Sequence, residues 1–109
     1  MVKISILYPN GEGKRFDMDY YLNQHMPLSI ELLSAYPGYR GVSVDRGLGG
    51  GTPDAPPAYV AMCHFMFDSV ESFIDAFMPN SPVLQGDMPN YTDIETIIQF
   101  SEVAISRTA

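Results

Sequence analysis

The chain is poor in charge, and above all in positive charge. Only 17% of its 109 residues are charged, against about 25% in average globular proteins, and six Lys and Arg face thirteen Asp and Glu. An acidic domain without a basic cluster is unsuited to phosphate backbones or anionic membrane surfaces. We therefore expect neither nucleic acid nor membrane among its partners.

Cysteine and long apolar runs are also scarce. The single Cys63 excludes a disulfide within the chain, and no run of apolar residues is long enough to cross a bilayer. The first residues lack the apolar segment and the small-residue cleavage site of a signal peptide. These absences predict a cytoplasmic protein.

Apolar side chains, by contrast, are abundant. Hydrophobic residues make up 46% of the sequence, including seven Tyr and six Phe, and the length corresponds to one domain over residues 1–109. So small a domain with so little charge has more apolar side chains than its own core accounts for. This surplus favours a partner surface, most simply a second copy of the chain.

Hydrophobic periodicity and turn signals predict the element order βαββαβ. Strands are expected at residues 2–8, 39–46, 58–67 and 94–105. A first helix is capped by Asp17 and kinked near Pro27, and a second begins at Asp68 or Ser69. This second helix is expected to end at 78–80, before a short helical segment at 81–87. If the first helix is only kinked, its buried stripe comprises Tyr21, His25, Leu28 and Leu32.

This order predicts an α+β, ferredoxin-like fold: a four-stranded antiparallel sheet with two helices on one face. Both alternating faces of 58–67 and 94–105 are apolar, so each of these strands needs cover on both sides. The helices cover only one side. We therefore expect a homodimer through the open face of the sheet.

One segment resembles a known family signature. Residues 17–28, Asp-Met-Asp-Tyr-Tyr-Leu-Asn-Gln-His-Met-Pro-Leu, are similar to the Tyr-Tyr-x-x-x-His-x-Pro-Leu signature of the EthD family, and residues 57–65 and 87–92 resemble its later blocks. The resemblance implies a dimeric α+β barrel. The family is named for a bacterial gene cluster that degrades ethyl tert-butyl ether, where it accompanies an oxygenase system. Related barrels include cofactor-free monooxygenases, lactone isomerases and haem-degrading enzymes.

His25 is the leading candidate for catalysis. It lies beside the helix break, from which its side chain can reach a cleft between the first helix and the sheet, and its ordinary pKa suits general acid–base work. The alternative is a core or capping histidine that bonds a carbonyl freed at the kink. The resemblance to the EthD signature favours the functional role.

Further candidates for contact with a ligand are Tyr21, His64, Asp87, Asn90 and Tyr91. The tyrosines offer aromatic walls with a hydroxyl, and for each the alternative is ordinary packing. The residues at 87–91 are expected at the mouth of the cleft, although Asp87 is equally compatible with a solvated helix end. His64 is either a core histidine of its strand or a polar contact to the ligand.

Cofactors and metals have no recognisable motif here. The glycine-rich stretch at 47–51 lacks the following Lys-Ser/Thr and the helix of a phosphate loop. Two histidines without a third ligand at motif spacing argue against zinc or iron. Cys63 is expected to be a buried, inert thiol because its neighbour His64 points to the opposite face. We therefore expect neither cofactor nor metal.

The sequence leaves several functions open. The first is a role in the catabolism of a small apolar ether or aromatic compound. In that role the protein is either an EthD-like oxidoreductase, independent of cofactors and similar to monooxygenases, or an accessory protein of an oxygenase system. The second is a protein that binds such a ligand without chemistry. The third is a cofactor-free isomerase or cyclase of the same barrel superfamily.

Overall fold

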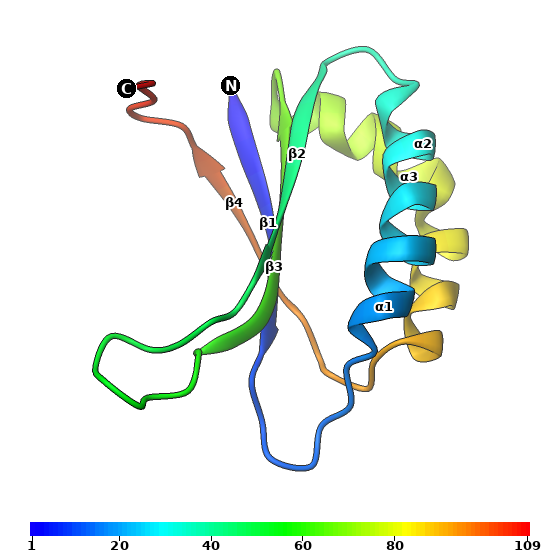
Figure 1. Ribbon diagram of the computed structural model, residues 1–109. Helices are drawn as coiled ribbons and strands as arrows, with labels where there is room; N and C mark the ends of the chain where they lie inside the picture. Colours follow the sequence, from blue (N-terminus) through cyan, green and yellow to red (C-terminus); the bar gives the residue numbers. More distant parts are fainter.

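The computed structural model describes all 109 residues, and it has the expected α+β architecture. The sheet order is β2-β3-β1-β4, and every neighbouring pair is antiparallel. Figure 1 shows the helices side by side on one face of this sheet. The ferredoxin-like fold predicted from the sequence is thereby confirmed. The elements are β1 (Val2–Pro9), α1 (Met18–Tyr20), η1 (Tyr21–His25), α2 (Met26–Ser34), β2 (Tyr39–Arg46), β3 (Tyr59–Phe67), α3 (Val70–Asp87), η2 (Met88–Asn90) and β4 (Ile97–Glu102).

The first helix begins at Asp17, whose side chain accepts a hydrogen bond from the Tyr20 N–H. Its second turn, η1, is a π-turn in which the Met26 N–H bonds the Tyr21 carbonyl, one residue further back than in an α-helix. Pro27 follows directly. In a regular α-helix its ring would clash with the carbonyl four residues earlier, and the wider turn relieves that conflict. The expected interruption is therefore a widened turn within one continuous helical segment.

The π-turn also changes which side chains of this helix are buried. The predicted stripe of Tyr21, His25, Leu28 and Leu32 is correct only in its first half. After the turn the buried residues are Met26, Ser29 and Leu33, whereas Leu28 and Leu32 are only partly buried. The extra residue in the turn shifts the buried face by about one position. His25 thus remains directed to the core.

The second long helix, α3, corrects the sequence prediction. It begins at Ser69 in a capping box with Ser72 and continues to Asp87 without the break expected at 78–80. Pro79 and Pro82 lie inside it. Each proline leaves one carbonyl without its helical donor, but these carbonyls belong to the exposed residues Asp75 and Met78, where water can bond them. The uninterrupted helix carries Asp87 to the side of the first helix.

Strand β4 is shorter than the expected 94–105. It pairs only with β1, from Leu7 opposite Ile97 to Val2 opposite Glu102. Because β1 begins at Val2, the chain beyond Glu102 has no strand to pair with, and Ile105 is 79% exposed.

The two faces of the sheet differ in cover. On the helix side, β3 contributes the buried residues Ala61, Cys63, Phe65 and Phe67 to the core. Its other face carries the intermediate positions of the strand, among them Met62 and Met66. This second face, which we call the open face, has no helix over it (Figure 1).

Candidate functional site

A cavity of about 260 Å³ lies between the sheet and the helices. Its walls come from β1, β3 and β4 on one side and from η1, α2 and α3 on the other, and 16 of its 20 lining residues are hydrophobic. The four polar lining residues are His25, Ser29, Gln85 and Thr96, and two of the hydrophobic ones, Tyr8 and Tyr21, carry hydroxyl groups. An apolar enclosure with few polar groups is the usual form of a small-molecule site.

His25 projects from the end of the π-turn onto the wall of this cavity. Its Nδ1 lies 2.9 Å from Oδ2 of Asp87, at the end of α3, although the two residues are 62 positions apart in sequence. Since an ionised carboxylate can only accept, the shared proton belongs to Nδ1. The other ring nitrogen, Nε2, has no hydrogen-bond partner within the chain, so it is available as an acceptor.

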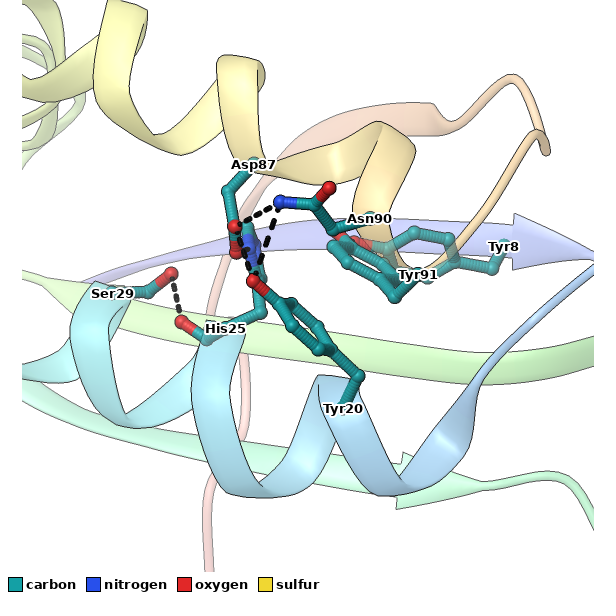
Figure 2. A network of polar contacts seen from close by, with 7 residues as sticks. All are labelled: Tyr8, Tyr20, His25, Ser29, Asp87, Asn90 and Tyr91. Atoms are coloured by element: carbon teal, nitrogen blue, oxygen red, sulfur yellow. Dashed lines mark hydrogen bonds and ion pairs between the residues drawn. The ribbon is translucent and has the colours of Figure 1, made fainter.

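Asp87 is the centre of a polar network (Figure 2). Its Oδ1 accepts a hydrogen bond from the Tyr20 hydroxyl at 2.6 Å and another from the Asn90 amide at 2.9 Å. Burial on its own would raise the pKa of this carboxyl, but the hydrogen bonds from Tyr20, Asn90 and His25 outweigh burial and hold the pKa below its usual range. Asp87 therefore stays ionised opposite His25.

The imidazole of His25 is neutral near pH 7. Burial lowers the pKa of His25, and the hydrogen bond and negative charge of Asp87 offset that effect only in part. Ser29, one turn further along, donates its hydroxyl to the His25 backbone carbonyl at 2.9 Å (Figure 2). The ring is stacked on Tyr21 at 5.9 Å and tilted against Tyr91 at 4.5 Å between centroids. A neutral, oriented imidazole with a free Nε2 can act as a general base.

Three buried tyrosines gather at one end of the site. The hydroxyls of Tyr8 and Tyr91 share a hydrogen bond of 2.8 Å, whereas the fully buried hydroxyl of Tyr21 has no partner. Tyr8 and Tyr21 line the cavity, and Tyr91 lies behind them against His25. Tyr8 was not predicted to be a site residue. The only indication in the sequence is that Tyr8 alternates along 2–8 in step with the apolar positions.

Five of the six predicted site residues are brought together by the fold. They are His25, Tyr21, Asp87, Asn90 and Tyr91, linked by the contacts above. His64 is not among them, because β3 alternates and Cys63 takes the position that faces the cavity. The structure thus places His64 away from the cleft, and the contact to the ligand that the sequence left open for His64 is not supported.

On the open face, His64 belongs to a different polar group. Its Nδ1 lies 2.7 Å from the Ser5 hydroxyl, and its Nε2 lies 3.3 Å from a carboxylate oxygen of Asp45. Ser5 on β1 lies directly opposite His64 on β3, whereas Asp45 on β2 is diagonal to His64 because it pairs with Met62. No spacing in the sequence indicated this arrangement.

Metal and thiol chemistry find little support in the side chains present. No three His, Cys, Asp or Glu residues are grouped closely enough to hold a metal ion. Burial raises the pKa of the Cys63 thiol to about 12, so the thiol stays protonated and is a poor nucleophile.

None of the helices has the length and the apolar character that a membrane crossing requires.

Comparisons with known proteins point to one family. The EthD domain matches residues 10–95. An EthD-like protein from Ralstonia eutropha JMP134 is 41% identical, with a TM-score of 0.90 over 98% of this chain and 95% of that one. An EthD family protein from Bacillus halodurans C-125 is 25% identical, with a TM-score of 0.69 over 94% and 97%. A proposed monooxygenase from Shewanella loihica PV-4 shares the fold at 12% identity, with a TM-score of 0.63 over 98% and 95%. No curated protein matches the chain.

Proposed function

Because this chain belongs to the EthD family and to its dimeric α+β barrel superfamily, we propose that it binds a small apolar compound carrying oxygen, and that His25 acts on this compound as acid and base. The compound is of the ether or aromatic kind handled in oxidative catabolism. The observation that carries the proposal is the hydrogen-bonded pair of His25 and Asp87 on the wall of an apolar cavity.

The size and lining of the cavity define the ligand. An apolar cavity of about 150 Å³ holds benzene, so 260 Å³ admits a single ring with a few further atoms. Sixteen hydrophobic lining residues favour an apolar body. His25 and the hydroxyl-bearing rings of Tyr8 and Tyr21 lie together at one end of the cavity, so the ligand's oxygen would be oriented to that end.

The His25–Asp87 pair supplies acid–base chemistry without a cofactor. Nε2 can accept a proton from the ligand, and the carboxylate of Asp87 then stabilises the imidazolium that forms. Tyr20 and Asn90 act as positioning residues, because both bond Asp87 rather than the cavity. Proton transfer of this kind serves a cofactor-independent oxygenase and an isomerase alike.

Binding without chemistry is the second candidate. It is favoured by the predominance of hydrophobic side chains among the 20 lining residues. In that case Nε2 of His25 accepts a hydrogen bond from a hydroxyl group of the ligand, and the protein delivers the compound to an oxygenase system.

We also propose that two copies pair through the open face. This face carries Leu7, Met62 and Met66, together with Ile97, which is 49% exposed. Apolar residues on a sheet face without helices are stabilised by burial against a second sheet. The cavity lies on the other side of the sheet, so pairing leaves it intact in each subunit.

The binding of 4-ethylphenol, a single ring with a few further atoms, tests the proposed site when it is followed by isothermal titration calorimetry. We expect the wild-type protein to bind, His25→Ala to lose about tenfold in affinity, and the matched variant His64→Ala to keep its affinity. Equal affinity in His25→Ala would remove His25 from the site. Conversion of the bound compound would favour catalysis, and tight binding without conversion would favour delivery.

A further inference from the structure

The hydroxyl of Tyr21 is the one buried side-chain oxygen in the protein without a hydrogen-bond partner. Tyr21 is fully buried, and its side chain lines the cavity. Buried hydroxyl groups in native proteins are nearly always paired, so an orphan at the wall of a cavity suggests that its partner is a ligand.

The neighbours of this hydroxyl do not satisfy it. The Tyr8 hydroxyl and the Cys63 thiol are close enough for a weak polar interaction with the Tyr21 hydroxyl, but neither is within the distance and angle of a formed hydrogen bond. Tyr8 is engaged with Tyr91 instead. Burial raises the pKa of Tyr21 far above its ordinary value, so this phenol keeps its proton and can donate it in a hydrogen bond.

Tyr21 and His25 face the same cavity. They stand at the two ends of the π-turn, and their rings are nearly parallel with centroids 5.9 Å apart. A ligand in the cavity therefore meets a neutral donor and a neutral base close together. This combination is suited to a ligand from which the base removes a proton next to an oxygen-bearing atom. The donor then stabilises the negative charge that develops on that oxygen.

We propose that the substrates are small neutral carbonyl compounds whose oxygen accepts a hydrogen bond from the Tyr21 hydroxyl. The inference rests on the proposed function of the cavity and specifies its substrate class. Carboxylates are disfavoured because the lining is apolar, the ionised Asp87 is adjacent, and the whole chain carries a net charge of −7.

The chemical step is an enolisation. His25 Nε2 removes a proton from the carbon next to the carbonyl, and the electron pair of that C–H bond forms a carbon–carbon double bond. The carbonyl π electrons move onto oxygen, where the Tyr21 hydroxyl stabilises the negative charge. The proton returns from Nε2 to carbon, so no oxidant or reductant is consumed.

A pair of probes of nearly equal shape isolates the hydrogen bond. Acetophenone carries a carbonyl oxygen where α-methylstyrene carries a methylene group. We expect the wild-type protein to bind acetophenone about tenfold more tightly, and Tyr21→Phe to lose this preference while it keeps its affinity for α-methylstyrene. The matched variant Tyr36→Phe, altered at a tyrosine outside the cavity lining, should behave as the wild type.

Deuterium incorporation into the acetophenone methyl group in D2O, followed by proton NMR, measures the chemistry. We expect incorporation with the wild type, at least a tenfold loss of rate in Tyr21→Phe, and none above background in His25→Ala. If the wild type binds acetophenone and α-methylstyrene equally tightly, and Tyr21→Phe does the same, the role of Tyr21 is overturned. The proposed function of the cavity is not affected by that result. Failure of the wild type to bind either probe would overturn both. A lower melting temperature of Tyr21→Phe would show that the hydroxyl has a partner within the chain, and would also overturn the inference.

Discussion

Replacement of Asp87 by Ala tests whether the polar network holds the site together. Three hydrogen bonds reach this carboxylate, at 2.6 to 2.9 Å. Tyr20 and Asn90 are accessible enough to bond water after the change, so their loss contributes little. His25, however, is only 6% exposed, and its Nδ1–H would remain unpaired at a cost of about 1–3 kcal/mol.

We therefore expect Asp87→Ala to lower the free energy of unfolding by about 2 kcal/mol. At roughly 4–8 °C per kcal/mol for a domain near this size, the melting temperature should fall by about 10 °C. Circular dichroism melts at pH 7 and equal protein concentration give this difference. Asp75→Ala is the matched control, because Asp75 is exposed on the same helix and has no hydrogen-bond partner; surface changes of this kind stay within about 0.5 kcal/mol. Equal melting temperatures of the two variants would refute the reasoning.

Three further outcomes follow from the structure. Tyr21→Phe removes an unpaired buried hydroxyl, so its free energy of unfolding should rise by about 1 kcal/mol, measured by urea unfolding; a fall would contradict this. The pKa of His25 is lower in the folded than in the unfolded chain, so the stability that it contributes is complete above about pH 6.5 and is lost as the pH falls through the lowered pKa. Urea unfolding at pH 7.5 and 5.5 should show this loss in the wild type, and His25→Ala should reduce it. Met62→Glu on the open face should turn a dimer into monomers in light scattering, whereas Ile105→Glu, at a residue 79% exposed, should not; a wild-type monomer at micromolar concentration would reject the pairing.

The fold could be predicted from the sequence because its signals are local. The alternation of 39–46 marks a strand whose observed bounds are identical. The side chain of Asp17 caps the first helix as its residue type suggests. Pro79 and Pro82 misled the prediction because proline is unfavourable in most helices, and nothing local reveals that the freed carbonyls are exposed.

The site was predictable only in its parts. His25 stands out beside Pro27, and Asp87 lies in a segment that resembles an EthD block, but their separation of 62 positions carries no signal that they form a pair. The sequence also did not decide which face of β3 points to the helices. Met62 and Met66, on the face that carries His64, are as apolar as Cys63 and Phe65 on the other face. The decision between these faces depends on how the helices pack, which is a property of the whole fold.

The most direct test of the proposed site is nitrogen-15 NMR of the two histidines, with and without acetophenone. At pH 7 we predict a neutral His25 with its proton on Nδ1, and an Nε2 resonance that moves when the probe is added, while both nitrogens of His64 stay unchanged. A proton on Nε2 of His25, or an Nε2 resonance that does not respond to saturating probe, would contradict the claim that this nitrogen faces the ligand as a base.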